Sequence, residues 1–322
     1  MNKTLNILVT NNHLVNVGGS ETFTYALIDG LKKKGHNVEY FTFEKGLVST
    51  KIENELKVPF LSKKEYDIVF ANHNTTISYL KKSIKSKFIQ TCHGIFPPLE
   101  QPHKYADGYI SISQEVQTHL SNKGYNSTLI LNGIDCKRFK TTKAPQPKLK
   151  SVLSLCQSKE ANTAIQQACN ALNLDFEYLD KNINPIWDIE NTINNHDLVI
   201  GLGRSIYEAM ACGRPVLIYD NRSYADSFAD GYLNKEILNN SIKNNCSGRY
   251  YKYKFSVNDL VNEIKKYDYK DGQFFRDFAL KNLNIEHQLD TYLEVANNTK
   301  VNKIKQLRFK FKQFRERNKQ AN

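Results

Sequence analysis

The sequence predicts an α/β protein made of two doubly wound, Rossmann-like domains that face each other across a cleft. Three observations support this fold class. Short apolar runs alternate with helical patterns along most of the chain, which is typical of parallel sheets covered by helices. A length of 322 residues suggests two domains. A polar segment with two prolines, 141–150, separates a first half (1–140) from a second (151–272) and is predicted to be a linker.

The first half opens with a strand, a glycine-containing loop, a helix and a second strand. The apolar run 5–9 predicts a buried strand, a helical pattern follows Gly18, Gly19 and Ser20, and 38–43 predicts the next strand. The loop lacks the Gly-x-Gly-x-x-Gly spacing of dinucleotide-binding proteins, which argues against a NAD site. Gly18 and Gly19 form either a tight turn or a loop that contacts a ligand.

Two further predicted strands end in polar residues. The run 67–71 is followed by His73, and 87–91 is followed by His93 and Gly94. Because open α/β sheets bind ligands at the carboxyl ends of their strands, these side chains are candidates for a site. The other histidines considered lack such a context and are expected to be structural: His36, His119, His196 and His287.

The most informative stretch is 197–220, which reads as a compact β-α-β unit. An apolar strand leads into a turn with Gly201 and Gly203, and Ser205 is the predicted N-cap of a helix over 206–212. Glycines let the backbone approach a ligand, and free N–H groups at a helix start attract an anion. The turn therefore suits a phosphate or diphosphate.

Two charged residues accompany this turn. Arg204 adds a fixed positive charge that suits phosphate, and Glu208 lies one helical turn further on. A carboxylate there can accept hydrogen bonds from sugar hydroxyls. The alternative is that Arg204 and Glu208 form only a surface ion pair, which would contribute a few tenths of a kcal/mol, roughly.

The pattern Gly-x-Gly-x-x-x-x-Glu-Ala-Met-Ala-x-Gly-x-Pro-Val, residues 201–216, resembles the donor-nucleotide motif of glycosyltransferase family 4 and its relatives with the GT-B fold. In that family two glutamates flank seven residues. The second holds the nucleotide ribose and the first contacts the donor sugar. Glu208 corresponds to the second, whereas Ile200 stands where the first is expected.

Other segments resemble the same family. Thr91-Cys-His-Gly94 is similar to its Thr-x-His-Gly segment, whose histidine reaches the donor sugar, so the resemblance implies a catalytic role for His93 as well as for Glu208. Asn132-Gly-Ile-Asp-Cys-Lys-Arg-Phe139 is similar to the segment that ends the first domain. In the family an Arg and a Lys after the first strand of the second domain hold the diphosphate. Here only Lys159 is present, and we infer that Arg204 replaces the arginine.

The resemblance implies transfer of a sugar from a nucleotide-diphosphate sugar to a cell-surface glycan or lipid-linked acceptor, with retention of the anomeric configuration. It also implies that the glycine loop at 18–19 borders the cleft and that a long helix, 273–298, crosses back onto the first domain. No Asp-x-Asp pair occurs, so neither a metal nor another cofactor is expected. The alternatives are a nucleotide-sugar epimerase or oxidoreductase on a similar scaffold, and a catalytically degenerate binding partner in polysaccharide assembly.

Charge is concentrated in the C-terminal segment 299–322. It holds nine Lys and Arg and one Glu, which gives +8 of the formal +12, so the remainder of the chain is not expected to bind nucleic acid. Apolar residues recur there at helical spacing: Val301, Ile304, Leu307, Phe311 and Phe314. This pattern predicts a basic amphipathic helix on an anionic membrane. A disordered tail, a helix docked on the protein and an RNA contact remain alternatives.

The location predicted from sequence is the bacterial cytoplasm, at or near the inner face of the membrane. No apolar run approaches the roughly 18 residues of a membrane span, and the N-terminus does not read as a signal peptide. None of the six cysteines forms a Cys-x-x-Cys pair, which argues against zinc and suits a reducing compartment. The abundance of Lys, Asn and Ile is typical of an AT-rich bacterial genome.

Overall fold

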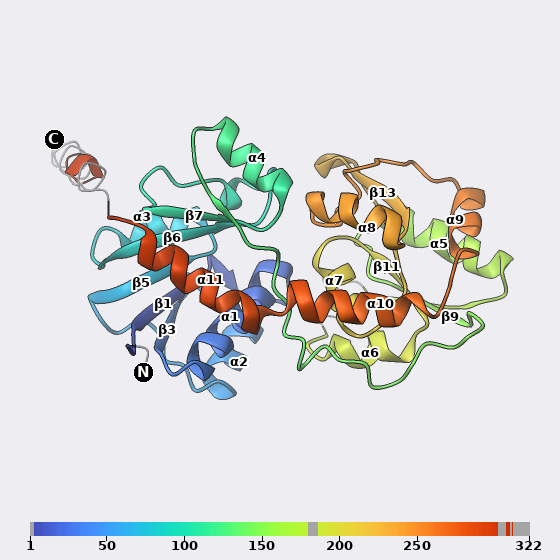
Figure 1. Cartoon of the computed structure of the whole chain (residues 1–322), viewed down its shortest axis with the longest axis horizontal. Coiled ribbons are helices and arrows are strands. Elements are labelled where there is room, and N and C mark those ends of the chain that lie inside the picture. Colours follow the sequence, from blue (N-terminus) through green and yellow to red (C-terminus); the bar gives the residue numbers. More distant parts are fainter. Residues whose placement is uncertain (1–2, 180–185, 302–306, 310, 312–322) are drawn as a thin grey trace.

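The computed structural model describes residues 3–179, 186–301, 307–309 and 311. Two α/β domains lie side by side, one around a six-stranded sheet and one around a five-stranded sheet (Figure 1). Both sheets are covered by helices, and each domain has apolar clusters on both faces of its sheet. The predicted fold class, two doubly wound Rossmann-like domains, is confirmed.

The sheet of the first domain is entirely parallel, in the order β3-β1-β5-β6-β7-β8. Along β1, Ile7 and Val9 point to one apolar cluster and Leu8 to the other, as expected for a strand buried on both faces. The strands are β1 (Asn6–Thr10), β3 (Asn37–Phe41), β5 (Glu65–Ala71), β6 (Lys85–Cys92), β7 (Gly108–Ser111) and β8 (Thr128–Leu129), and the short strands β2 (His13–Leu14) and β4 (Glu44–Lys45) pair separately. The helices are α1 (Gly19–Lys33), α2 (Leu47–Asn54), α3 (Asn74–Leu80) and α4 (Gln114–Asn122).

The sheet of the second domain has the order β10-β9-β11-β12-β13, with only the edge strand β13 antiparallel. Its central strand β11 is fully buried, which explains its uninterrupted apolar run. The strands are β9 (Ser151–Ser154), β10 (Asp175–Tyr178), β11 (Leu198–Gly201), β12 (Val216–Arg222) and β13 (Ser227–Tyr232). The helices are α5 (Lys159–Ala171), α6 (Ile189–Asn195), α7 (Arg204–Ala211), α8 (Lys235–Ser241), α9 (Val257–Ile264) and α10 (Asp271–Phe278).

The chain crosses between the domains twice, and the two crossings pair with each other. The Ile134 N–H donates to the Leu283 carbonyl at 2.7 Å, and the Ile285 N–H donates to the Ile134 carbonyl at 3.0 Å. Ile134, Cys136 and Phe139 already pack in a core cluster of the second domain. The first crossing therefore lies several residues before the predicted linker 141–150.

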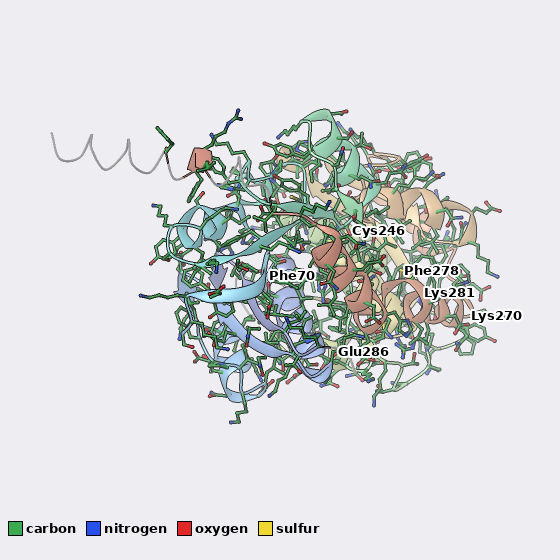
Figure 2. The ribbon with its side chains drawn as sticks, turned by 60° about the vertical axis from the view of Figure 1, so that its left-hand side comes forward. Phe70, Cys246, Lys270, Phe278, Lys281 and Glu286 are labelled. Atoms are coloured by element: carbon green, nitrogen blue, oxygen red, sulfur yellow. The ribbon has the colours of Figure 1, made fainter. Side chains whose placement is uncertain are left out.

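The prediction of one continuous helix over 273–298 is wrong. The chain instead forms α10, a π-helical turn over Ala279–Leu283, and α11 (Ile285–Asn298). Asn284 separates them because its extended backbone lets Ile285 bond to the other crossing, and its side chain caps α11 by accepting from the Glu286 N–H at 3.2 Å. Lys270 marks the start of α10 and Glu286 the start of α11 in Figure 2.

The predicted return of the C-terminal helix to the first domain is present. α11 lies across the first domain and packs against α1 (Figure 1). Gly30 of α1 allows this close approach, because a Cβ there would meet Leu289 Cδ1 at 2.6 Å. Leu289, Tyr292 and Ala296 consequently belong to the core of the first domain.

None of the described helices has the length and apolar character needed to span a bilayer. All six cysteines are buried free thiols.

We expect Leu289→Ala to lower the free energy of unfolding by about 2–5 kcal/mol, because it removes a buried side chain that joins α11 to α1. The matched control Glu294→Ala, on the exposed side of the same helix, should change stability by less than about 0.5 kcal/mol. Urea denaturation measures both. Equal effects of the two substitutions would show that α11 is not part of the first domain's core.

Candidate functional site

A cleft of about 1070 Å³ lies between the domains. The first domain contributes the loops that follow β1, β5 and β6, and the second contributes the start of α7 and the segments around Gln157, Arg222 and Arg249. Both sheets therefore present the carboxyl ends of their strands to the cleft, as open α/β folds do at ligand sites.

Contacts at two places hold the walls of the cleft together. Arg249 of the second domain pairs with Glu115 at the start of α4 through Nε at 2.8 Å and Nη2 at 2.5 Å. Elsewhere, the Trp187 ring packs edge-on against Tyr25 of α1, with centroids 4.9 Å apart. These contacts join the two walls of the cleft directly.

The start of α7 differs from the sequence prediction. The N-cap is Gly203, with φ at +62°, and the helix begins at Arg204, so Ser205 lies inside the helix and is not its cap. Glycine suits the capping position because its positive φ is strained for other residues, and its N–H donates to the Cys246 carbonyl at 2.8 Å. Gly203, Arg204 and Ser205 all line the cleft.

Arg204 and Glu208 form an ion pair, but a buried one. Arg204 Nε donates to Glu208 Oε1 at 2.9 Å, and both side chains are less than 10% exposed. Arg204 Nη1 also donates to Asn132 Oδ1 at 3.1 Å and to the Gly133 carbonyl at 2.7 Å. Burial raises the pKa of Glu208 and lowers the pKa of Arg204, and the contact between them opposes both shifts. Arg204 thereby ties α7 to the first crossing.

The glycine loop of the first domain lies opposite α7. A Cβ on Gly19 would come 3.9 Å from Arg204 Cδ, across the domain boundary. A Cβ on Gly18 would clash with the Glu21 carboxylate. Both glycines line the cleft. The missing side chain at Gly18 leaves room for the Glu21 carboxylate, whereas a Cβ at Gly19 would make only an ordinary contact with Arg204.

Sequence reasoning missed His13 and Glu21, which lie in this same wall. His13 Nε2 is 3.0 Å from Glu21 Oε1, and the Ser20 hydroxyl donates to Glu21 Oε2 at 2.9 Å. Burial raises the pKa of Glu21, but the hydrogen bonds from His13, its own backbone and Ser20 together bring it below the usual value. Glu21 is therefore a buried carboxylate that stays ionised. Its position two residues after Gly19 was the available signal.

His93 lies at the end of β6 as predicted and lines the cleft. Its Nε2 donates to Asn72 Oδ1 at 2.9 Å, and Asn72 is oriented because its own amide N–H groups bond to Thr10 and Thr24. Burial lowers the pKa of His93 to about 3, with His73 and Arg204 adding to the shift. His93 is accordingly a neutral imidazole with Nδ1 as a hydrogen-bond acceptor.

His73 also lines the cleft, and it is neutral for the same reason. The Asn12 N–H donates to its Nδ1 at 3.1 Å, and its ring stacks on His13 with centroids 5.6 Å apart. Burial lowers the pKa of His73 to about 4.

Three of the histidines expected to be structural bond to neighbouring groups within their own domains: His36, His119 and His196.

Two of the predicted donor-binding residues are not among those that line the cleft. Lys159 is exposed at the first position of α5. Gly201 ends β11 beneath the surface, where a Cβ would contact Leu155 Cβ at 3.4 Å and Ser205 Cβ at 3.5 Å. Its predicted close approach is therefore to the protein's own packing rather than to the open cleft.

The second domain instead presents residues that the motif did not reveal. The Asp220 carboxylate accepts hydrogen bonds from the Gln157 and Ser158 N–H groups and from Arg222 Nε, which fixes the segment before α5 against β12. Two buried amide oxygens in the cleft, Gln157 Oε1 and Asn245 Oδ1, have no donor among the residues that the structure describes. Such orphaned acceptors are suited to a ligand's N–H or O–H groups.

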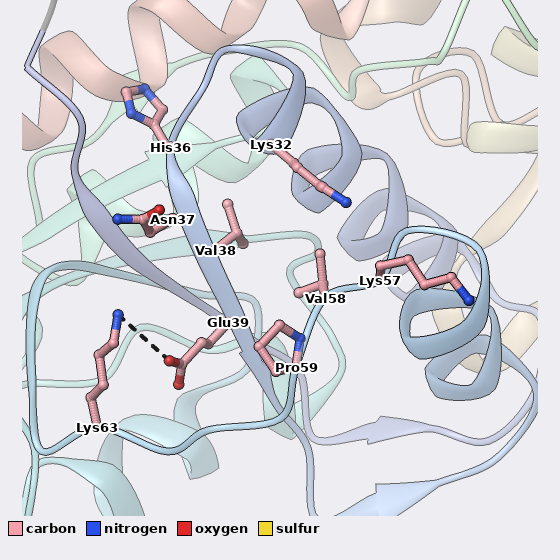
Figure 3. Close-up of a pocket in the computed structure, with 9 residues that line it drawn as sticks. All are labelled: Lys32, His36, Asn37, Val38, Glu39, Lys57, Val58, Pro59 and Lys63. Atoms are coloured by element: carbon pink, nitrogen blue, oxygen red, sulfur yellow. Dashed lines mark ion pairs between the residues drawn. The ribbon is translucent and has the colours of Figure 1, made fainter.

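A smaller depression of about 440 Å³ lies at the opposite edge of the first domain (Figure 3). Two of the three lysines that line it are engaged: Lys32 donates to the Leu56 carbonyl, and Lys63 lies 3.7 Å from Glu39 and 3.0 Å from Asn6 Oδ1. It also sits near the amino end of β3, away from the carboxyl ends that form the cleft. We therefore assign the candidate site to the interdomain cleft.

We expect His93 and His73 to remain neutral between pH 5.5 and 8, as followed by NMR of their ring protons. The unfolded chain has histidine pKa values of about 6.5, so it binds more protons than the folded chain at mildly acidic pH. The stability that each contributes is therefore complete above pH ~6.5 and is lost as the pH falls toward the folded-state values of about 3 and about 4. A His93 midpoint near 6.5 would contradict its burial.

The sequence matches no protein-family model and no curated protein. Solved structures do match the fold. A glycosyltransferase from Rickettsia africae ESF-5 gives a TM-score of 0.60 at 16% identity, over 92% of this chain and 99% of that one. An alpha-glucosyltransferase in complex with UDP and a 13-mer DNA gives 0.56 at 10% identity, over 92% and 100%. The catalytic domain of starch synthase IV from Arabidopsis thaliana, bound to ADP and acarbose, gives 0.55 at 10% identity, over 92% and 99%. This chain has the GT-B fold, in which two Rossmann-like domains face each other across a cleft.

Proposed function

We propose that this chain is a glycosyltransferase that moves a sugar from a nucleotide-diphosphate sugar to a cell-surface glycan or lipid-linked acceptor. The observation that carries the proposal is the start of α7, where free N–H groups, Arg204 and Glu208 meet in the interdomain cleft. The first N–H groups of a helix bind anions, and the carboxylate one turn later suits a ribose. The solved structures of this fold include complexes with UDP and with ADP.

The donor would lie mainly on the second domain. In this proposal the diphosphate contacts the Arg204 and Ser205 N–H groups, and the ribose hydroxyls donate to Glu208. Gln157 and Asn245 supply unpaired acceptors for the nucleotide. Arg222, whose Nε holds Asp220, adds positive charge to the same wall and takes the place that the sequence suggested for Lys159.

The transfer we propose is metal-independent. The sequence has no Asp-x-Asp pair, and no three His, Cys, Asp or Glu side chains converge as metal ligands within the described part of the chain. Negative charge on the leaving diphosphate would be stabilised by the α7 N–H groups and the guanidinium groups, which are fixed before the reaction starts. Closure of the two domains would exclude water and limit hydrolysis of the donor.

Two other functions were considered for this chain besides sugar transfer. An epimerase or oxidoreductase would require a dinucleotide, for which the glycine spacing is absent. A degenerate scaffold is kept open by Ile200, which occupies the position where the resembled family has a glutamate. The same resemblance implies retention of the anomeric configuration, and we include retention in the proposal.

A thermal-shift panel of UDP, GDP, ADP, CMP and NAD tests the proposal. We expect UDP or GDP to stabilise the protein, by about 2.7 kcal/mol at 100 times the dissociation constant. Glu208→Gln should weaken that nucleotide about 10- to 100-fold, because a hydrogen bond to a charged group is lost. The control Lys159→Ala, outside the cleft lining, should bind within about twofold of wild type. Stabilisation by NAD alone would reject the transferase in favour of an oxidoreductase or epimerase.

We also propose that the basic segment 299–322 binds an anionic membrane surface. Most of this segment lies outside the described residues. Of the apolar residues that are described, Leu307 and Phe311 are more than half exposed, while Phe309 is buried against the Tyr105 ring at 4.9 Å. The segment can thus rest on the first domain and still present apolar side chains. Each basic residue near such a surface contributes about 1 kcal/mol.

Vesicle sedimentation tests the membrane proposal with the full chain. We expect binding to phosphatidylglycerol-containing vesicles but not to pure phosphatidylcholine vesicles, and weaker binding at high salt because the attraction is screened. The double variant Leu307→Ser with Phe311→Ser should bind these vesicles less tightly, because the substitutions remove the apolar contact with the membrane. Equal binding to both vesicle types would contradict an electrostatic contact.

A further inference from the structure

A buried polar network lies beneath the first-domain wall of the cleft. Its side chains come from β1, α1, α3 and the end of β5, and all are almost completely buried: Thr10, Asn11, Thr24, Asn72 and Thr76. In the described chain none of the five lines the cleft. Buried polar groups destabilise a fold unless each finds a partner. Here Thr24 Oγ1 accepts from Asn11 Nδ2 at 2.9 Å and from Asn72 Nδ2 at 3.0 Å.

Two main-chain carbonyls fix the direction of these hydrogen bonds. The Thr10 carbonyl can only accept, so the Asn72 amide turns its Nδ2 toward it, at 3.2 Å. The Thr24 hydroxyl gives its one proton to the Ser20 carbonyl at 2.7 Å, and it must therefore accept from Asn72. Both N–H groups of the Asn72 amide are thus used within the network. Its Oδ1 is consequently the atom that faces His93.

This orientation decides which nitrogen of His93 carries the proton. Asn72 Oδ1 has no proton to give, so its 2.9 Å bond to His93 requires a protonated Nε2. Burial, His73 and Arg204 all oppose a positive charge on the imidazole. Because a neutral imidazole has one N–H group only, Nδ1 is bare. The edge-on contact with Phe23, with centroids 5.1 Å apart, also restricts the plane of the ring.

The bare Nδ1 is available to a ligand. His93 lines the cleft and is only half-buried. In the described ranges of the chain the bond to Asn72 is the one hydrogen bond of its side chain. Arg204 at the start of α7 acts electrostatically on the imidazole, so His93 lies near the proposed diphosphate site. A substrate group that bonds to Nδ1 must supply the proton, as a sugar hydroxyl can.

We propose that Asn72 is a positioning residue that holds His93 in the Nε2–H tautomer, so that Nδ1 accepts a hydrogen bond from a sugar hydroxyl in the cleft. The inference rests on the proposed function. Asn72 does not line the cleft and acts only through His93. With the proton on Nδ1, His93 could not accept from that hydroxyl, and this means of orienting the sugar would be lost.

Nitrogen NMR of the full chain without ligand tests the tautomer, with His93→Phe used to assign the signals. We expect wild type at pH 7 to carry the proton on Nε2. Asn72→Leu removes the acceptor and should give a mixture of tautomers. Asn72→Asp keeps an acceptor oxygen and should restore the Nε2–H form. It should also raise the His93 midpoint from about 3 by about 1–3 pH units, because a carboxylate favours the imidazolium.

Either of two NMR results would overturn the inference. One is a wild-type proton on Nδ1, and the other is an unchanged tautomer in Asn72→Leu. The matched control is Asn194→Leu, because Asn194 is also a buried amide and donates to the Lys140 carbonyl at 3.0 Å and to the Glu190 carbonyl at 2.8 Å. It should lower stability and leave the His93 tautomer as in wild type. A tautomer change equal to that of Asn72→Leu would show general destabilisation instead of positioning.

Binding measurements test the effect on the substrate. The probes are UDP, GDP, UDP-glucose, UDP-N-acetylglucosamine and GDP-mannose, and the nucleotide sugar that binds most tightly is used. We expect Asn72→Leu to weaken this nucleotide sugar about 3- to 10-fold, the effect of one neutral hydrogen bond, and to leave the Kd of the free nucleotide within twofold. His93→Phe should have the same effect, and the double variant should show no further loss, because Asn72 acts through His93.

Additive losses in the double variant would overturn the inference, as would an unchanged nucleotide-sugar Kd in Asn72→Leu. Failure of every nucleotide and nucleotide sugar to bind would instead reject the proposed function. The tautomer measurement needs no ligand and would still decide whether Asn72 positions His93, so the two failures are distinguishable.

Discussion

The buried pair of Arg204 and Glu208 is the interaction on which the arrangement of the site depends. The Arg204 guanidinium bonds both to Glu208 on α7 and to Asn132 and Gly133 on the first crossing. That crossing is in turn paired with the second at Ile134. The start of α7, which would hold the donor, is thus attached directly to the first crossing between the domains. A ligand that contacts Glu208 acts on a residue whose partner also sets the position of the two domains relative to each other.

The two walls of the cleft differ in chemistry. The second domain presents N–H groups, arginines and unpaired amide oxygens, which suit a nucleotide diphosphate. The first domain presents His13, Glu21, His93 and Glu100, and burial gives them different protonation states. His93 is a neutral acceptor, Glu21 an ionised carboxylate, and Glu100 a carboxyl that titrates near neutrality. The groups suited to the nucleotide diphosphate therefore lie mainly on the second domain, and the buried titratable groups of the cleft lie mainly on the first.

The fold and the central motif could be predicted from sequence because local signals encode them. Apolar runs marked the strands, and the turn with Gly203 marked the start of α7. The predicted cap at Ser205 was wrong because the cap of α7 needs a positive φ, which Gly203 supplies. The predicted continuous final helix was wrong because Asn284 pairs with the first crossing, which is distant in sequence. The ion pair of Arg249 with Glu115 could not be predicted, since it joins residues of different domains. Burial of Arg204 likewise depends on contacts remote in sequence.

A crystal structure of the protein with the nucleoside diphosphate that stabilises it would test the proposed donor site directly. We expect the diphosphate at the Arg204 and Ser205 N–H groups and the ribose hydroxyls within hydrogen-bonding distance of Glu208. Arg204 should keep its bonds to Asn132 and Gly133. A nucleotide bound elsewhere, such as in the depression beside Lys63 and Glu39, or a ribose that does not contact Glu208, would contradict this assignment of the site.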